Sequence, residues 1–381
     1  MDVVSNFTPV IAKQKGLLAW HGLRARVRQW TKAELVPRMV GFDEEFSSAR
    51  KECRVAPQQV PVAVDGLKFV NEARHLCHTS YLIPEDYVAT VHNVLYCPKN
   101  GAILTNDGRF LRESISTAET FYRNWKPVSS DQLRSPRYLD GYATILRSRY
   151  NNHYHTLLDN LPRLMAISRP PFTDLAKIKL LYDGTLSDLE AFLLPKLLPS
   201  NVQLVQVELD ALIRLESLLF TPFKTRNYAG YLPRCYVDLF RSSVFPGRPP
   251  RADRRIIIKR SGATGRRGLE NEADVLRALA SLGFRGYVLE NLSFKEQVDL
   301  FYDAEVVIGV HGAGLANLLF TPHCKVVELF STVAVVPHYF FLCASLGHEY
   351  TCVVGDRYSQ NAPCRVDINR LLGHLDRLGI R

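Results

Sequence analysis

The stretch "VVIGVHGAGLANLLF", residues 306–320, decides the fold class. Its β-branched residues predict a buried strand, its closely spaced glycines predict a tight turn, and the apolar residues that follow predict a helix. A strand that enters such a turn can receive an anionic ligand on unpaired backbone N–H groups at the start of the helix. However, the spacing Gly312-x-Gly314-x-x-Asn317 lacks the third glycine of the dinucleotide-binding fingerprint, and no Walker-type Lys-Ser/Thr follows. Two interpretations stay open: an anion-binding turn that includes His311, or a turn that simply requires glycine.

Strand and helix patterns alternate on both sides of this stretch, which predicts two α/β domains with doubly wound parallel sheets. A segment rich in Pro, Gly and Arg, residues 245–255, separates the two alternations as a linker. Ligands of such sheets bind at the carboxyl ends of the strands, so we expect the site in a cleft between the domains. The first domain has a predicted helix at 155–168, a strand at 177–183, a helix at 186–198 and a strand at 201–209; the second has strands at 255–259, 286–290, 306–310 and 325–330 and helices at 271–283 and 293–304.

The N-terminal part of the chain has a different pattern. Residues 13–32 carry six Lys/Arg, no acidic residue and two tryptophans at helical spacing. This predicts a basic amphipathic helix that either lies on an anionic membrane surface or packs on its own domain. Short β-rich runs from about 80 to 147 predict a β-meander. We therefore divide the chain into an N-terminal helical and β-meander extension (1–75), a first domain (76–245), a second domain (246–365) and a C-terminal helix (366–381).

The composition is that of a globular protein with a basic surface. The net charge is +10 over 381 residues, which favours acidic partners such as phosphorylated small molecules or an anionic membrane. No RNA-recognition signature or zinc-finger spacing is present, so we expect no nucleic-acid partner. The eight cysteines form no C-x-x-C pair, and no uninterrupted apolar stretch is long enough for a membrane span. We expect a cytoplasmic protein with buried thiols, peripheral on the inner face of the plasma membrane through residues 13–32.

In the second domain, polar residues follow the predicted strands. Arginines follow the first strand, and His311 follows the third. Asn271 can cap the helix that begins beside it, and Ser293 forms a capping box with Glu296. Arginine side chains and backbone donors at one sheet edge suit a diphosphate. The candidate residues are Lys259, Arg260, Arg266, Arg267, Asn271, Glu290, Ser293, His311, Gly312, Gly314 and Glu328.

The first domain contains "NNHYHTLLDNLPRL", residues 151–164. His155 and Asp159 are four residues apart, so they share one helix face, and the carboxylate can orient the imidazole and raise its basicity. Such a pair can act as a general base. The alternative is a purely structural pair at the start of a helix. A metal site that adds His153 requires this residue to lie before the helix, because alternate helical positions diverge.

These motifs together resemble family 61 glycosyltransferases. The resemblance rests on "HYHTLLDNLPRL" followed by "RSGATGRRGLENEADVL", "ENLSFKEQVDLFYDAEVVIGVHGAGLANLLF" and "VVELF", and it covers roughly residues 80–345. It implies a GT-B fold of two facing Rossmann-like domains, a nucleotide-sugar donor, and inversion at the anomeric carbon. The sugar would be transferred to a hydroxyl of a glycan or lipid-linked glycan acceptor, and a UDP-sugar is the expected donor.

The resemblance also implies roles for particular residues. The family's histidine and acidic residue fall on His155 and Asp159, which would be catalytic. Arg163, in the Leu-Pro-Arg element, would lie on the acceptor side. Thr156 departs from the aromatic residue usual at its position, which puts the acceptor identity in question. The implied donor-binding residues are Arg260, Arg266, Arg267, Asn271, Glu290, Ser293, His311, Gly312, Ala313, Gly314, Leu315, Asn317 and Glu328.

We expect no metal and no other cofactor. The sequence has no Asp-x-Asp motif, and the arginines with His311 can neutralise the departing nucleoside diphosphate. Two other functions remain open. The spacing His155-x-x-x-Asp159 also fits an acyltransferase motif, and the fold could serve as an inactive carbohydrate-binding scaffold on a membrane.

Overall fold

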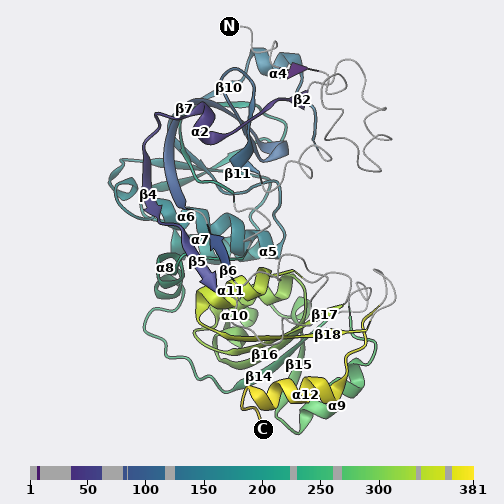
Figure 1. The fold of residues 1–381 in the computed structure, drawn as a ribbon. Coiled ribbons are helices and arrows are strands. Elements are labelled where there is room, and N and C mark those ends of the chain that lie inside the picture. The colour runs from purple at the N-terminus through teal and green to yellow at the C-terminus, as the bar shows by residue number, and fades with distance from the viewer. Residues whose placement is uncertain are drawn as a thin grey trace.

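The structure is a computed structural model that describes residues 7–8, 36–61, 80–83, 85–115, 125–223, 230–260, 268–331, 336–356 and 363–381. The predicted helix at 13–32 and the candidates Arg266 and Arg267 lie outside these ranges. In the described part of the chain, no helix has the length and apolarity needed to cross a bilayer. Two sheets, each with its own helices, are joined through a layer of helices between them (Figure 1).

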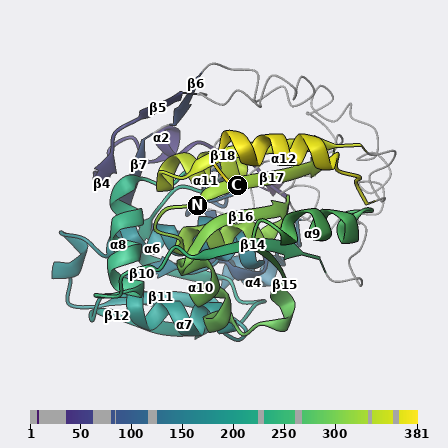
Figure 2. The same ribbon diagram turned by 90° about the horizontal axis from the view of Figure 1, so that it is seen from below.

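The second sheet confirms the predicted doubly wound domain. Its five parallel strands have the order β15-β14-β16-β17-β18, so the strand order reverses between β14 and β16. Helices α10 and α11 lie on the face toward the first sheet, and α9 and α12 lie on the opposite face (Figures 1 and 2). The elements are β14 (Arg254–Lys259), α9 (Glu272–Ala280), β15 (Phe284–Val288), the 3-10 turn η9 (Leu289–Asn291), α10 (Phe294–Tyr302), β16 (Ala304–Val310), the 3-10 helix η10 (Ala313–Phe320), β17 (Lys325–Ser331), α11 (His338–Leu346), β18 (Glu349–Gly355) and α12 (Ile368–Arg377).

Both faces of this sheet are buried, which explains its nearly continuous Val and Ile runs. Ile256 and Val307 point toward α10 and α11 and join the large core between the two sheets. Their neighbours Ile257 and Val306 point the other way, into the core beneath α9 and α12. Alternate residues of each strand therefore serve two different cores, and the strand ends are left for polar residues.

The first sheet is mixed, which corrects the prediction of a doubly wound parallel sheet. Strands β12-β11-β10-β13 are parallel to one another, whereas β7 pairs antiparallel with β13 and continues into β8 and β9. Helices from residues 153–167, 188–197 and 234–244 contribute to the core on one face, whereas α2 packs on the other. The local pattern could not predict this arrangement, because β7 and β13 are more than 100 residues apart. These elements are β7 (Asp86–Cys97), β8 (Ala102–Leu104), β9 (Phe110–Leu111), β10 (Arg137–Ile145), α5 (His153–His155), the π-helical turn η6 (Thr156–Asn160), α6 (Leu161–Ile167), β11 (Ile178–Asp183), α7 (Asp188–Leu197), β12 (Val202–Val207), β13 (Ile213–Phe220) and α8 (Arg234–Val244).

Shorter elements complete the first part of the chain. Strands β3 and β4 extend the first sheet, while β1 pairs with β2 and β5 pairs with β6 in separate ribbons. Within the described residues, six cysteines are free thiols and five of these are buried, as predicted. The remaining elements are β1 (Phe7–Thr8), β2 (Val36–Pro37), β3 (Met39–Val40), α2 (Phe42–Glu45), β4 (Lys51–Val55), β5 (Gln58–Pro61), β6 (Ser80–Ile83), η4 (Pro98–Asn100), η5 (Arg112–Ser114), α4 (Ser130–Arg134) and η7 (Phe172–Asp174).

The two sheets share one apolar core. Helices α6, α7 and α8 from the first part pack with α10, η10 and α11 from the second in a single cluster of buried residues. The Arg241 guanidinium on α8 donates to the carbonyls of Thr321 (2.8 Å) and Leu346 (3.4 Å) across this junction. The helix layer is therefore buried from both sides.

The predicted linker is anchored by one buried carboxylate. Asp303, at the end of α10, is 0% exposed and accepts hydrogen bonds from Arg248 (2.8 Å) and from the backbone N–H (3.1 Å) and guanidinium (2.8 Å) of Arg251. Phe245 stacks on Tyr302 with ring centroids 3.7 Å apart. The chain between α8 and β14 is thus held against the second sheet, and the proposed domain boundary at 245/246 stays a prediction.

We expect Asp303→Ala to lower the free energy of unfolding by about 2 kcal/mol, because it removes the buried acceptor of several charge-assisted hydrogen bonds that hold the linker. The neighbouring Asp299→Ala is the matched control. Asp299 is 37% exposed and pairs with Arg248 at 2.7 Å, so its loss should cost at most about 1 kcal/mol. Urea unfolding followed by circular dichroism measures both. Equal effects of the two substitutions would contradict the anchoring role of Asp303.

The same carboxylate makes the fold sensitive to acid. Burial alone would raise the pKa of Asp303, but the hydrogen bonds from Arg251 and the charge of Arg248 outweigh it and lower the pKa. Its contribution to stability is therefore complete above the unfolded-state pKa of about 4 and is lost as the pH falls through the lowered value.

Candidate functional site

His155 and Asp159 form a close pair in the structure. The imidazole Nδ1 lies 2.5 Å from Asp159 Oδ2; the His155 side chain is 26% exposed, whereas the Asp159 side chain is buried. Because a carboxylate only accepts, Nδ1 carries the hydrogen and Nε2 is the ring nitrogen available to a ligand. The ring stacks on Tyr150 at 4.9 Å and meets Tyr154 edge to face at 5.3 Å. The imidazole is thus fixed in one tautomer and one orientation.

A π-helical turn lies between the two members of this pair. The helix begins at Asn152, whose side chain caps it by accepting from the His155 N–H (3.1 Å). It passes through η6 (Thr156–Asn160) and becomes regular again at Leu161; Pro162, inside this continuous helix, supplies no backbone donor to the preceding turn. Single π-helical turns occur frequently at functional sites.

A second histidine–carboxylate pair lies in the other domain. His311 Nδ1 is 2.6 Å from Glu328 Oε1, and the other oxygen, Oε2, accepts from the Tyr350 hydroxyl at 2.6 Å. The Glu328 side chain is fully buried and the His311 side chain is 25% exposed. Glu328 therefore stands behind His311 and orients it. The ring also stacks on Phe330 with centroids 5.3 Å apart.

The glycine turn lies at the point where the strand order reverses. Arg260, which follows β14, donates from Nη2 to the His311 carbonyl at 3.1 Å, so it reaches the end of β16. A Cβ at Gly312 would lie 1.5 Å from Arg260 Nη2, and a Cβ at Gly314 would lie 2.8 Å from Leu289 Cδ1. A side chain at either glycine would therefore displace the end of the Arg260 or Leu289 side chain from its present position. Ala313 starts η10, and Leu315 is buried in the shared core.

Aromatic rings connect the two histidine–carboxylate pairs. Tyr154 contacts His155 on one side and Tyr339 on the other, with centroids 5.9 Å apart, and Tyr339 contacts His311 at 5.5 Å. His338 lies 5.6 Å from Tyr154 and 6.2 Å from His311. The pairs from the two domains thus lie on either side of one aromatic cluster.

His153 joins the two domains and does not join the catalytic pair. Its Nε2 lies 2.7 Å from Asn317 Oδ1, while Asn317 Nδ2 donates to Gln297 Oε1 at 3.0 Å. Burial lowers the pKa of His153, and the hydrogen bond to Asn317 only partly offsets this effect. His153 begins the helix, so the arrangement required for a metal site with His155 and Asp159 is not met. Among the described residues, no group of three or more His, Cys, Asp or Glu side chains is placed to hold a metal ion.

Other predicted site residues have mainly structural contacts. Asn317 is fully buried between His153 and Gln297. The Asn271 side chain does not cap α9, contrary to our expectation, because it forms two hydrogen bonds with the backbone of Val366, at 2.9 and 3.1 Å. The capping box of Ser293 and Glu296 is confirmed, with the Ser293 hydroxyl 2.7 Å from the Glu296 carboxylate.

The remaining predicted residues lie around the glycine turn or near the His155–Asp159 pair. Glu290 is exposed on η9, which adjoins Gly314 through Leu289. Lys259 pairs with Glu272 at 3.3 Å. Arg163 is turned inward on α6 and donates to the carbonyl of Leu146 at 3.4 Å.

The sequence patterns did not single out Tyr154, Tyr339, His338 or Tyr350. Tyr339 donates from its hydroxyl to the Gly312 carbonyl at 2.6 Å, so it fixes the glycine turn from α11. The run "PHYFFL" at 337–342, which forms the start of α11 after β17, was the available signal. These residues act through tertiary contacts, which a local motif does not reveal.

Comparisons with known proteins agree with this geometry. Residues 153–327 match the model of the glycosyltransferase 61 family, a range that includes His155, Asp159, Arg260 and His311. The chain is 33% identical over 136 residues to the beta-1,2-xylosyltransferase XAX1 of Oryza sativa subsp. japonica, which is 33% of this chain and 23% of that protein. It is 38% identical over 64 residues to a beta-1,2-xylosyltransferase of Arabidopsis thaliana, which is 16% of this chain and 12% of that protein.

The matched segments thus span less than a quarter of the length of these relatives. The family match nevertheless extends from the first histidine–carboxylate pair through the glycine turn and into β17, in the order predicted from the motifs. Over residues 153–327, this chain is similar to glycosyltransferase family 61.

Proposed function

We propose that this protein is an inverting, metal-independent glycosyltransferase that moves a sugar from a nucleotide-sugar, a UDP-sugar, to a hydroxyl of a glycan or glycolipid acceptor. The observation that carries the proposal is the pair of histidine–carboxylate contacts, one from each domain, on either side of the cluster of Tyr154, Tyr339 and His338. Inversion requires a base on one side of the anomeric carbon and charge stabilisation on the other.

The donor diphosphate would bind at the glycine turn. Arg260 and the start of η10 supply positive charge and backbone donors at the switch point of the second sheet. With Nδ1 bound to Glu328, a doubly protonated His311 directs its Nε2–H outward. This group would donate to the leaving phosphate, and the buried carboxylate behind it stabilises the imidazolium form. Charge on the departing nucleoside diphosphate would thus be neutralised by the chain's own residues.

The acceptor hydroxyl would be deprotonated by His155. Its Nε2 lone pair takes the proton while the Asp159 carboxylate stabilises the resulting imidazolium through Nδ1–H. Since Asp159 is buried behind the ring, we assign the proton acceptor to His155 and the orienting role to Asp159. The oxygen then attacks the anomeric carbon, and the bond to the diphosphate oxygen breaks on the opposite face.

A binding screen tests the proposed function directly. UDP and UDP-sugars, including UDP-xylose, should raise the melting temperature of the full chain in the presence of EDTA, whereas coenzyme A should not. Release of UDP from the matching donor should also proceed in EDTA. Stabilisation by coenzyme A alone would select the acyltransferase alternative, and loss of UDP release in EDTA with recovery on adding Mn²⁺ would overturn metal independence.

We expect His311→Ala to lower turnover by about 10²-fold, the usual effect of removing one donor that stabilises developing charge. Glu328→Gln keeps the shape but removes the charge behind the ring, so it should lower turnover in the same direction. His323→Ala is the control, because His323 is an exposed histidine of the same domain that contacts the Gly347 carbonyl at 2.9 Å. Steady-state kinetics on folded variants measure these changes in turnover. Equal turnover of His311→Ala and His323→Ala would refute the donor site.

We expect Asp159→Asn to keep the melting temperature and UDP affinity while turnover falls by about 10²- to 10⁴-fold, the range of general-base catalysis. The amide would remove the negative charge that stabilises the protonated His155. Melting curves, UDP titration and kinetics on the same preparation give the answer. A parallel loss of stability and UDP affinity would assign the pair a structural role, and near-normal turnover would exclude it as the base.

A further inference from the structure

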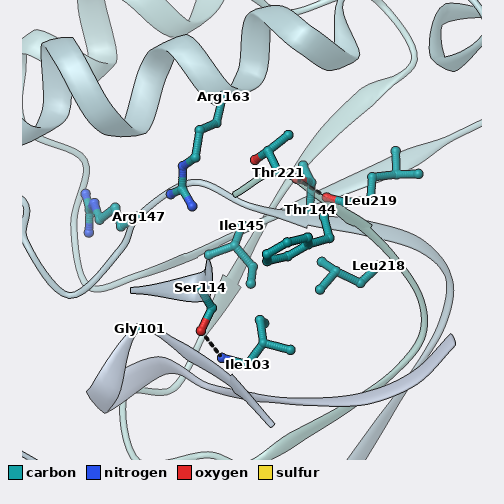
Figure 3. Close-up of a pocket in the computed structure, with 11 residues that line it drawn as sticks. Gly101, Ile103, Ser114, Thr144, Ile145, Arg147, Arg163, Leu218, Leu219 and Thr221 are labelled. Atoms are coloured by element: carbon teal, nitrogen blue, oxygen red, sulfur yellow. Dashed lines mark hydrogen bonds between the residues drawn. The ribbon is translucent and has the colours of Figure 1, made fainter. Parts of the chain in front are cut away.

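Arg163 on α6 is a partly buried cation with a buried Nε, and it follows the proposed base on the same helix. Its side chain points into a cavity of about 20 Å³ in the first domain, beside Arg147, Thr144 and Thr221 (Figure 3). A volume of this size holds about one water molecule. The cavity is therefore too small for a sugar or a nucleotide, and the charge of Arg163 needs another explanation.

The two arginines of this cavity differ in how their charges are balanced. Arg147 forms a bidentate pair with the buried Glu190, at 2.7 and 2.6 Å, and also donates to the carbonyl of Thr185 at 2.7 Å. Among the described residues, Arg163 has no carboxylate oxygen within 4.0 Å. Its Nη2 makes only long hydrogen bonds, to Asn160 Oδ1 (3.3 Å) and to the Leu146 carbonyl, and its Nε is buried without a hydrogen-bond partner.

Asp159 precedes Arg163 by four residues, so the two lie one turn apart on the same helix. Asp159 Oδ2 is bound to His155, but Oδ1 is buried and has no hydrogen-bond partner in the described part of the chain. Burial lowers the pKa of Arg163 to about 10, and the charge of Asp159 acts in the opposite direction. The guanidinium therefore stays charged near neutral pH. A cation removed from water destabilises the fold unless an opposite charge lies nearby. Asp159, four residues earlier on the same helix, supplies such a charge and is also a member of the proposed catalytic pair.

We propose that Arg163 is a positioning residue of the His155–Asp159 pair, which acts through Asp159 and touches neither sugar. This inference rests on the proposed function, and it replaces the acceptor-side role expected for Arg163 from the sequence. The positive charge of Arg163 holds Asp159 in its ionised form and opposes uptake of a proton by the pair before the acceptor arrives. The pair is thus kept ready to act as a base.

The positive charge of Arg163 determines the direction in which the pH profile of kcat/KM should move when Arg163 is replaced. Without Arg163, the pair takes up its proton at a higher pH, so the acid limb of the kcat/KM profile moves to higher pH. The other titratable or charged groups around the pair and around Arg163 remain in every variant. Tyr150 and Tyr154 lie against the His155 ring, and Tyr154 in turn is near His338, Tyr339 and Glu328. Asp86 and Tyr96 on β7 lie near Arg163, and Arg147 lines the same cavity.

The experiment compares kcat/KM against pH for the full chain and for Arg163→Met, Arg163→Gln and Arg163→Lys, with the donor found in the binding screen. The acid limb should move up by about one pH unit in the two neutral variants and stay in place in Arg163→Lys. Arg241→Met is the matched control, because Arg241 is also a partly buried arginine on a helix; among the described residues its guanidinium donates to the carbonyls of Thr321 and Leu346, and its Nε has no hydrogen-bond partner. It should lose stability without moving the limb.

A second readout does not depend on turnover. With labelled histidine and His155→Gln for assignment, the His155 ring resonances should titrate at a higher pH in Arg163→Met than in the unchanged chain. The inference is overturned if neither the acid limb of the kcat/KM profile nor the His155 resonances move in Arg163→Met and Arg163→Gln. It is also overturned if the acid limb moves by the same amount in Arg163→Lys. If Asp159→Asn is fully active, the proposed function itself fails; if Asp159→Asn is inactive and the limb does not move, only the role of Arg163 fails.

Discussion

The structure depends on one constraint: the helix layer between the two sheets is buried on both sides. Helices from the first part of the chain meet α10, η10 and α11 in a single apolar cluster, so α11 is apolar almost all round. A polar group that enters this layer must find its partner inside it. The relay of His153, Asn317 and Gln297 and the carbonyl contacts of Arg241 meet that requirement. The layer thereby fixes the relative position of the two sheets and of the residues at their edges.

His155 and His311, at the edges of the two sheets, have nearly the same local environment. Each imidazole binds a buried carboxylate through Nδ1 and leaves about a quarter of its side chain exposed. The carboxylates differ, however, in the groups that lie behind them. Glu328 shares its second oxygen with the Tyr350 hydroxyl, whereas Asp159 has a cation one helical turn away. In the proposed reaction, the His311–Glu328 pair would face the departing diphosphate, and the His155–Asp159 pair would face the acceptor hydroxyl.

The sequence predicted well the parts of the molecule that local patterns govern. Four of the five strands of the second sheet, the glycine turn and the capping box of Ser293 follow from apolar periodicity and turn residues close together in the chain, whereas β18 and α11 were not predicted. The pair of His155 and Asp159 follows from helical spacing. In contrast, the pairing of His311 with Glu328, the hydrogen bonds of Asn271 to Val366 and the antiparallel place of β7 join residues separated by 17 to more than 100 positions. Such contacts depend on the register of strands and on the layer between the sheets, which no short motif encodes.

The π-helical turn at Thr156–Asn160 has a consequence for how this region can vary. A π turn holds one residue more than the α-helical turn it replaces, and removing a residue restores regular winding. The segments on either side of the turn would keep nearly the same rotation, because the π turn takes up its extra residue within a single turn. His153 would therefore keep its position opposite Asn317, whereas His155 and Asp159, which lie on either side of a deleted residue, would come one position closer in sequence. The π turn thus allows the spacing of the His155–Asp159 pair to change without turning the start of the helix away from the second sheet.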